Sequence, residues 1–517
     1  MMNNNNNNNF EHIPQEKFEF VQLNSRLRDK KLETKSRSFF QDAMIRFKKN
    51  KSSVFATWIL AFLLLYAIVA PLLSPYDTSD KDKMFKNFPA YVPSIAEKGW
   101  GILDGAKVHK SQNETAVTVW RGIAEETGMD PVIRTVGTSS YTVRERGQEV
   151  TKYRYDLECN RYYEKGIEYW TMSYDEFEKI QRWQDETGLQ VFYPWVQPDD
   201  IGVEDKALAD ADMWYRTDKK GAPKLDKEGN FVPVYCTDKS KEGAPYTSTR
   251  IEGDDGSYIY SFATSGSVKV RLCYYNYYRY LNGTEPTYWM GTTSMGQDLF
   301  SGIGYGARFS LIFAILVSAV NLSMGAVYGA VQGYYGGRID MFMDRISDVL
   351  SGVPMMVVIT LFQLHLGDSM SPVGAFLLAF IVTGWIGMAA LTRKQFYRFK
   401  SQEFVMAART LGASDKRLMF KHIFPNAIGT IITSCALVIP GVIRSETTMT
   451  YLGIVNLEDI AGTTVGTLLS QGQATFVEAP HTMLWPSIFM GLLMISFNLF
   501  GNGLRDAFNP TTRGAGD

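Results

Sequence analysis

Histidine and cysteine are both scarce in this chain, which contains five His and four Cys among 517 residues. The His residues lie far apart and form neither HExxH nor HxxxH, so no metal site or catalytic triad is expected. The phosphate-binding pattern GxxxxGK(S/T) is also missing, which excludes a nucleotide site of that type. These gaps argue against an enzyme, and we expect neither catalytic residues nor a cofactor.

Neither sign of charge dominates, because 53 basic and 54 acidic residues give a net charge of −1. This balance gives no indication of a nucleic-acid partner, and none is expected. Hydrophobic residues make up 45% of the chain although its mean hydropathy is slightly negative. The apolar residues must therefore be concentrated in segments.

Six apolar stretches are long enough, or nearly so, to cross the roughly 30 Å of a bilayer core, which takes about 20 helical residues. They are residues 54–73, 309–331, 349–366, 375–391, 427–443 and 483–500. Pro354 and Pro440 interrupt the third and fifth stretches, which is tolerated where neighbouring helices cover the backbone. We therefore expect an α-helical polytopic membrane protein with six transmembrane helices in the lipid bilayer, the first within residues 51–74.

Lys and Arg lie mainly on one side of these expected spans. They crowd residues 37–51 and recur at 338–345 and 393–421, whereas short loops on the other side, such as 367–371, carry none. This positive-inside pattern places the protein in the cytoplasmic membrane with both termini in the cytoplasm. Residues 1–50 are then a cytoplasmic tail with a disordered Asn-rich start, and no cleaved signal peptide is expected.

The polar stretch between the first and second spans, residues 75–287, would lie outside the cytoplasmic membrane. Its patterns are capped helices at 113–128 and 173–188, a hairpin at 141–155 with its turn at Arg146 and Gly147, and strand-like alternation at 257–280. A segment of about 200 residues is large enough for its own core. We expect an extracytoplasmic α+β domain inserted between helices 1 and 2.

Tyrosine is dense near the end of this insert, at Tyr274, Tyr275, Tyr277, Tyr278 and Tyr280. The alternation favours a strand with surface and core positions, and a surface that binds carbohydrate or peptide is the alternative. The insert also holds Cys159, Cys236 and Cys273, an odd number that allows at most one disulfide without indicating which pair forms it. Cys435 falls in the fifth span and is expected to be a small core residue.

The segment at residues 403–426 lies between two apolar stretches but carries too many charges to cross a bilayer. A short helix is expected over 401–413, ended by Gly412 in a left-handed cap. A second helix would begin at Ser414 and be stopped by Pro425. Such a helix-turn-helix at the membrane surface suits docking into a groove of another protein, and a solvated basic loop is the alternative.

This segment resembles the EAA loop of ABC importer membrane subunits, in the version found in oligopeptide and dipeptide permeases. The loop pattern is Glu-Ala-Ala, three residues, Gly and a longer gap that ends in Leu-Pro. The matching positions are Met406, Ala407, Ala408, Gly412, Phe424 and Pro425. Met406 replaces the usual Glu, which removes a charge that could bond to an ATPase, and Phe424 replaces the usual Leu.

The resemblance continues over about residues 288–513 and the first span, in the order typical of the family. Matching residues include Asp298, Tyr305, Gly306, Ala307, Arg308, Gly336, Gly337, Asp340, Arg345, Asp348, Pro354, Glu446, Leu452 and Gly453. Thr293 and Asn502 stand where the family usually has Asp, and Gln297 stands where it usually has Arg.

This resemblance implies the fold of a type I ABC importer permease, with residues 288–517 as the core that holds helices 2–6 and 393–425 as a cytoplasmic coupling loop. It implies half of a pore for oligopeptides or dipeptides, completed by a second permease subunit, driven by two cytoplasmic ATPase subunits and supplied by an extracytoplasmic binding protein. The residues implied in ATPase coupling are Glu403, Ala407, Ala408, Gly412, Ala413, Ser414, Asp415 and Pro425.

The implied mechanism is movement of residues 403–421 as a rigid body when the ATPases close on ATP. Small residues in the spans would allow the close helix contacts that sliding needs, namely Gly325, Gly329, Gly333, Gly384 and Gly387. Two alternatives stay open: an importer of nickel or another small solute, and a membrane-tethered receptor or assembly protein that acts through the external domain. The resembling family usually has a short connection in place of residues 75–287, so it gives no function for this insert.

Overall fold

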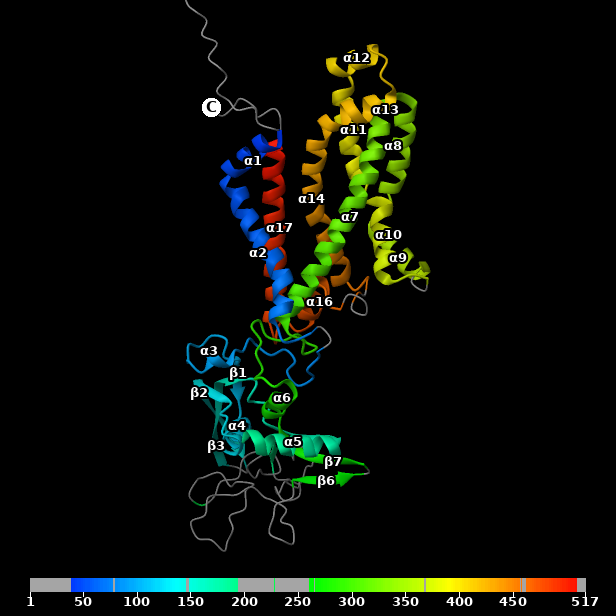
Figure 1. Ribbon diagram of the computed structural model, residues 1–517. Coiled ribbons are helices and arrows are strands. Elements are labelled where there is room, and N and C mark those ends of the chain that lie inside the picture. The colour runs from blue at the N-terminus through cyan, green and yellow to red at the C-terminus, as the bar shows by residue number, and fades with distance from the viewer. Residues whose placement is uncertain are drawn as a thin grey trace, which may run out of the picture.

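The computed structural model describes residues 39–77, 80–145, 148–193, 227, 260–264, 266–366, 369–455, 457 and 462–508. A long helical bundle stands at one end of the molecule and an α/β module at the other (Figure 1). The chain passes between them at the end of helix α2 (Lys51–Leu73) and at the start of helix α7 (Leu299–Tyr335).

Within the described part of the chain, five helices are long and apolar enough to cross a membrane. They are Lys51–Leu73 (α2), Leu299–Tyr335 (α7), Pro372–Lys400 (α10, Pro372–Thr383, with α11, Ile386–Lys400), Asp415–Tyr451 (which ends in α14, Phe424–Tyr451) and His481–Phe508 (α17). Helices α1 (Phe39–Lys49) and α16 (Val465–Ala474) pack against α17. The helical character expected for the first, second, fourth, fifth and sixth apolar stretches is therefore confirmed.

The third apolar stretch is bent. Helices α8 (Gly337–Ser351) and α9 (Met355–Leu366) meet at a bend of 72°. Pro354 causes the break because it has no backbone N–H and disfavours helical backbone at Val353 before it. The interruption expected at Pro354 is confirmed, and the six expected spans are reached only if the bent pair counts as one span.

The module contains two antiparallel sheets. One has the strand order β1–β3–β2 and the other β4–β7–β5, with β6 paired to β7. The strands are β1 (Ala106–Gln112), β2 (Val132–Glu145), β3 (Gln148–Asn160), β4 (Ile167–Ser173), β5 (Phe192–Tyr193), β6 (Ser261–Thr264) and β7 (Ser267–Cys273). The helices are α3 (Pro93–Ala96), α4 (Glu114–Thr127), α5 (Tyr174–Thr187) and α6 (Tyr274–Asn282). The module is thus of the α+β class.

Two helices of the module begin and end as their sequences predict. In α4 the Asn113 side chain accepts the N–H of Ala116, and Gly128 closes the helix with a φ of 71°. In α5 Ser173 caps the first turn in the same way, and Gly188 closes the helix with a φ of 70°. The hairpin of β2 and β3 is confirmed by its pairing, and its expected turn at residues 146–147 lies outside the described residues.

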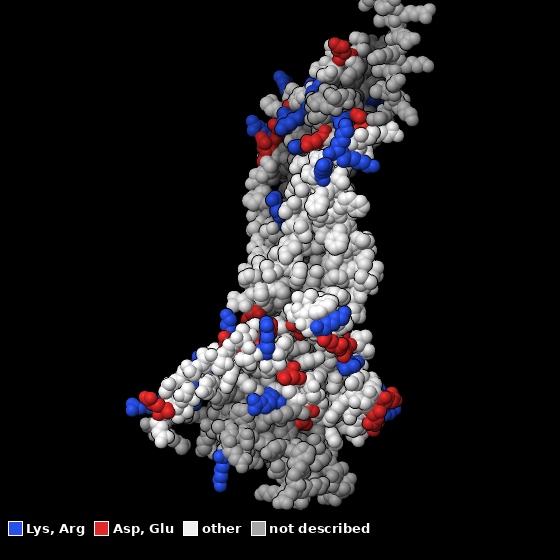
Figure 2. All heavy atoms as spheres, turned by 90° about the vertical axis from the view of Figure 1, so that its left-hand side faces the viewer, with Lys and Arg blue, Asp and Glu red and all other residues white. Residues whose placement is uncertain are grey.

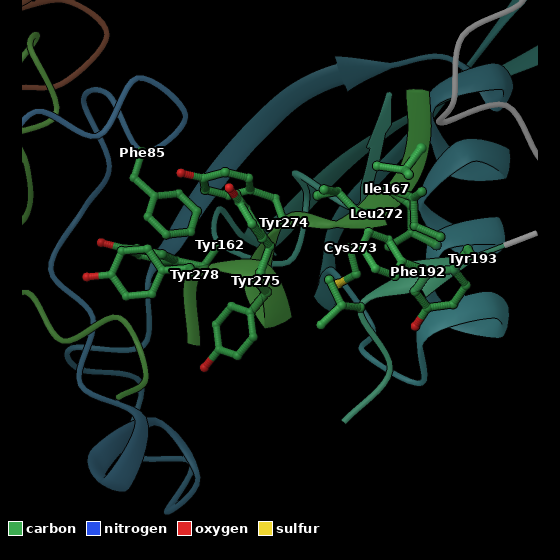
Figure 3. Packing of buried hydrophobic residues seen from close by; sticks show 14 of the residues in the cluster. Phe85, Tyr162, Ile167, Phe192, Tyr193, Leu272, Cys273, Tyr274, Tyr275 and Tyr278 are labelled. Atoms are coloured by element: carbon green, nitrogen blue, oxygen red, sulfur yellow. The ribbon is translucent and has the colours of Figure 1, made fainter. Parts of the chain in front are cut away.

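The tyrosine run forms helix α6 and not the expected strand. Tyr274, Tyr275, Tyr277 and Tyr278 are all buried, so the helix packs on several sides at once. Figure 3 shows the rings of Tyr274 and Tyr278 near Phe85 and Tyr162 in the module core. A strand and a short helix that is buried on all sides can both have closely spaced aromatic residues. The spacing of the tyrosines therefore could not distinguish a strand from a helix. Four of the five tyrosines of the run therefore belong to the module core.

The cysteines that the structure describes are free thiols. Cys159 and Cys273 are buried in the module, Cys435 is half-buried in α14, and Cys236 lies outside the described residues. Burial raises the pKa of the Cys273 thiol to about 11. Reagents that need a thiolate should therefore react poorly with Cys273 while the module is folded.

Asp298 joins the start of α7 to the end of the first span. Its carboxylate accepts the N–H groups of Ser301 (2.9 Å) and Phe300 (3.3 Å) and the hydroxyl of Ser74 (3.0 Å), which directly follows α2. The Tyr66 hydroxyl of α2 donates to the Phe300 carbonyl oxygen at 2.7 Å. These bonds fix α2 and α7 together at the point where the chain enters and leaves the module.

Candidate functional site

Residues 403–423, here termed the loop element, lie at the end of the bundle farthest from the module (Figure 1). The element begins with the short helix α12 (Glu403–Thr410). Gly412 then adopts a φ of +82°, and the N–H of Ala413 bonds to the carbonyl oxygen of Ala408 at 3.1 Å. The left-handed turn expected at Gly412 is confirmed.

The second half of the loop element runs directly into the following span. Helix α13 (Asp415–Arg417) leads into a π-helical turn, η4 (Leu418–Ile423), and then into α14. The expectation that Pro425 stops this helix is wrong, because Pro425 occupies the first turn of α14. A proline normally clashes with the carbonyl four residues earlier, and the wider π turn relieves that clash.

The underside of the loop element is anchored in an apolar cluster. Buried side chains from the element and from the ends of α7 and α11 form it together: Val405, Leu418, Met419, Ile423, Ala330, Tyr334 and Phe396. Ala408 and Ala413 are half-buried and pack against the same cluster. Burial of this kind stabilises the position of the element against the bundle.

Polar contacts add to this attachment. The Tyr334 hydroxyl of α7 donates to the Asp415 carboxylate at 2.5 Å, and the Arg409 guanidinium donates to the same hydroxyl at 3.4 Å. Nearby, the Lys400 ammonium group of α11 donates to the Gly333 carbonyl oxygen of α7 at 3.1 Å. Both halves of the loop element are thus bonded to one tyrosine of the long helix α7.

The outer face of the loop element carries exposed apolar side chains. Leu411 is 88% exposed and Met406 55%, and Phe404 and Phe420 are exposed as well. Ala407 and Ala408 were both expected to enter a groove of a partner protein, but they point to different sides. Ala407 is exposed, whereas Ala408 packs inward. Sequence reasoning did not select these larger side chains, although Leu411 and Met406 flank the small-residue patch.

The remaining expected site residues occupy different surroundings. Glu403 is exposed in the first turn of α12, and Ser414 is exposed in N-cap geometry before α13 without a side-chain bond to that helix. Asp415 is held by Tyr334, as described, and Pro425 is exposed on α14. Ala408, Ala413 and Asp415 therefore lie on the anchored side of the loop element. The other expected site residues are exposed.

A charged cluster below the loop element was not expected from the sequence. The Arg393 guanidinium of α11 bonds to Asp340 at 2.6 Å and to Asp344 at 2.8 Å, both on α8. The Tyr397 hydroxyl donates to Asp340 at 2.5 Å. Asp340 and Asp344 are four residues apart on α8, as are Arg393 and Tyr397 on α11. This spacing shows that the members of each pair share a helix face, but it does not identify the helix that they face.

Comparison with known proteins identifies the family. Residues 325–514 match the family described as binding-protein-dependent transport system inner membrane component, and residues 38–90 match the N-terminal TM domain of oligopeptide transport permease C. The oligopeptide transport system permease protein OppC of Bacillus subtilis (strain 168) is 37% identical over 238 residues, which cover 45% of this chain and 76% of that protein. The chain belongs to this permease family.

Two further relatives are similar to this permease. The dipeptide transport system permease protein DppC of Bacillus subtilis (strain 168) is 36% identical over 44% of this chain and 69% of its own length. The OppC protein of Haemophilus influenzae is 34% identical over 44% of this chain and 72% of its own length. This permease is thus a polytopic membrane subunit of the type I ABC importer fold, with an α+β module between α2 and α7. Residues 91–324, which include most of the module, lie between the two family matches.

The permease has a close seam between α7 and α11. A Cβ atom at Gly329 would lie 2.2 Å from the Ala389 carbonyl oxygen, and Gly325 and Gly333 meet α11 similarly closely. Gly384 likewise approaches Asn321 of α7. The expected close packing is confirmed at these four positions and is wrong at Gly387, where a Cβ would meet open space.

Charged groups of the permease gather at its two ends. Figure 2 shows Lys, Arg, Asp and Glu over the module and over the opposite end, whereas the visible face of the bundle between them carries few. Such a band is typical of a surface in contact with hydrocarbon. The loop element therefore lies beyond one edge of the apolar band and the module beyond the other.

Proposed function

We propose that this permease forms one half of the translocation pore of an ABC importer for oligopeptides or dipeptides. A second permease subunit completes the pore, two cytoplasmic ATPase subunits drive it, and an extracytoplasmic binding protein delivers the peptide. The relatives named for oligopeptide and dipeptide transport support this substrate class over nickel or another small solute. Membership of a permease family supports transport over a receptor or assembly role.

The observation that carries the proposal is the two-sided character of the loop element. Its inner side is anchored through Val405, Leu418 and Tyr334, and its outer side exposes Met406 and Leu411. An exposed apolar patch on a rigid support is typical of a docking surface. In this proposal the patch inserts into a groove on an ATPase subunit, with Ala407 and Gly412 permitting close approach.

The contacts of the loop element give a route for the movement. When the ATPase subunits close on ATP, a push on the element passes to α7 through Tyr334 and the apolar cluster. The glycine seam couples α7 to α11, and Arg393 couples α11 to Asp340 of α8. The helices then tilt together, which switches access to the pore from one side of the membrane to the other.

The proposed orientation places both termini and the loop element in the cytoplasm, because Lys and Arg concentrate around residues 37–51 and 393–421. The module then lies outside the membrane. It joins the outer ends of α2 and α7 through the Asp298 bonds, which supports a position beside the mouth of the pore. We assign it a role in binding-protein docking or in pore access.

Substitution of Gly412 tests the coupling role. A Cβ there meets no neighbour within 4 Å, so Gly412→Val acts through backbone strain alone, at a cost of roughly 1–2 kcal/mol. We expect the variant complex, reconstituted in proteoliposomes with its partners, to import several-fold less peptide per ATP hydrolysed. Gly412→Asn should retain more activity because Asn tolerates the left-handed conformation.

The matched control is Gly491→Val in α17, where a Cβ also meets open space and the glycine has no positive φ. This variant should behave as wild type. Unchanged uptake and unchanged assembly of the Gly412→Val complex would show that the loop element does not transmit the ATPase movement.

A further inference from the structure

Helix α14 buries one face within the chain and leaves another open. Val442, Ile443 and Glu446 are buried, whereas Arg444 and Thr448, one turn apart, are exposed. A Cβ at Gly441, one turn before Arg444, would meet nothing within 4 Å. The open face of this membrane-spanning helix thus carries a guanidinium group.

Arg444 directly follows the apolar stretch 427–443 of this helix. It precedes Tyr451, the last residue of α14, by seven residues, which corresponds to about 10 Å along a helix axis. The neighbouring Glu446 accepts a hydrogen bond from the Ser310 hydroxyl of α7 at 2.7 Å. Ser310 is itself eleven residues beyond Leu299, the first residue of α7. The bond between Ser310 and Glu446 is therefore not at the end of either helix.

In the described part of the chain, no carboxylate forms an ion pair with Arg444. Glu446 points to the buried face and is bonded by Ser310 and Thr447. Arg308 of α7 provides a contrast, because its guanidinium donates to the Ile68 carbonyl oxygen at 3.2 Å. A charged side chain at the border of an apolar span is costly where it meets hydrocarbon and usually faces a water-filled path or a partner of opposite charge.

We propose that Arg444 lines the translocation path and binds a carboxylate group of the peptide as it passes. This assignment rests on the proposed function. A guanidinium group presents parallel N–H donors that match the two oxygens of a carboxylate. Every unmodified peptide supplies such a group at its C-terminus, and an Asp or Glu side chain supplies a second source. The contact would hold one end of the peptide against the open face of α14.

The test compares three peptides in proteoliposomes that contain the complete transporter. They are a pentaalanine free acid, its C-terminal amide, and an amide of the same length with one Asp. Arg444→Gln should lower free-acid uptake about tenfold, the order expected for a hydrogen-bonded charge, and leave uptake of the neutral amide unchanged. Arg444→Lys should retain part of the free-acid uptake.

Comparison of variant with wild type for each peptide cancels any preference of the binding protein, because the same protein delivers both forms. Lower uptake of the Asp-containing amide by the variant would show that Arg444 binds either source of carboxylate. Unchanged uptake of this amide would show that the contact is restricted to the C-terminal carboxylate. Ile432→Gln, at another exposed position of α14, is the control and should affect the peptides equally.

Equal losses for the free acid and the neutral amide would overturn the assignment, because they indicate that Arg444 pairs with the second permease subunit. No loss for any peptide would also overturn it and would indicate that Arg444 faces lipid. A wild-type complex that imports none of the three peptides would instead contradict the proposed function, and the assignment would fall with it.

Discussion

Asp82 is a single residue on which the start of the module depends. Its carboxylate accepts the N–H groups of Met84 and Phe85 and the hydroxyl of Tyr274. Burial nevertheless raises the pKa of Asp82, since desolvation of the charge exceeds the stabilisation from these bonds. Ionisation of Asp82 therefore destabilises the folded state. The hydrogen bonds that the carboxylate accepts offset only part of this effect.

A pH dependence follows from this raised pKa. Because the folded-state pKa lies above the unfolded value, stability is greatest below the unfolded pKa and is lost as pH rises through the folded pKa. Asp82→Asn keeps an acceptor oxygen but removes the charge, so it should raise the melting temperature near pH 7 and weaken the loss of stability as pH rises above the ordinary pKa of Asp. Thermal unfolding of the full chain in detergent measures both effects.

The exposed Asp185 on α5 provides the control, and Asp185→Asn should leave the pH dependence of unfolding as in wild type. If Asp82→Asn instead melted lower than wild type at pH 7, the hydrogen bonds to the charged form would outweigh its desolvation.

At the scale of elements, the glycine seam between α7 and α11 decides how closely these helices approach. Gly329→Ala would force a Cβ against the Ala389 carbonyl oxygen, and overpacking of this kind costs about 1–3 kcal/mol. We expect a lower melting temperature and reduced ATP-driven uptake. Gly387→Ala adds the same methyl group in α11 where space is open, so it should change neither. Equal behaviour of the two variants would show that the seam is not tightly packed.

The sequence predicted elements well where a local signal was available. Asn113 begins a helix through its side-chain hydrogen bond, and Gly128 ends it through its left-handed backbone. Gly412 likewise forms a turn through its left-handed backbone. It failed where neighbours decided the outcome. The tyrosines of α6 form a helix because core contacts surround them, and Pro425 is tolerated because the preceding turn is π-helical.

The candidate site was predictable only in part for the same reason. Its small residues and its left-handed glycine were readable from a short segment. The bond from Tyr334 to Asp415 joins residues that are 81 positions apart, and the Arg393–Asp340 pair spans 53. Spacing along a helix identifies which residues share a face, but it does not identify the partner face.

At the scale of the whole molecule, the permease separates an α+β module from the loop element by the length of its apolar bundle (Figure 1). The central claim is that the loop element docks on the ATPases at the cytoplasmic end while the module lies on the other side. Leu411 is the most informative position for this claim because it is 88% exposed at the tip of the element.

Site-directed thiol cross-linking in the assembled transporter tests this claim most directly. Leu411→Cys, in a chain with Cys236 and Cys435 replaced by Ser, should form a covalent product with an ATPase subunit when a short bifunctional thiol reagent is added. The control is Ser140→Cys, an exposed position on β2 of the module, which should give no such product. A product from Leu411→Cys alone is the result predicted. Absence of that product from an active complex whose ATPase cysteines are accessible, or a product from Ser140→Cys, would contradict the account.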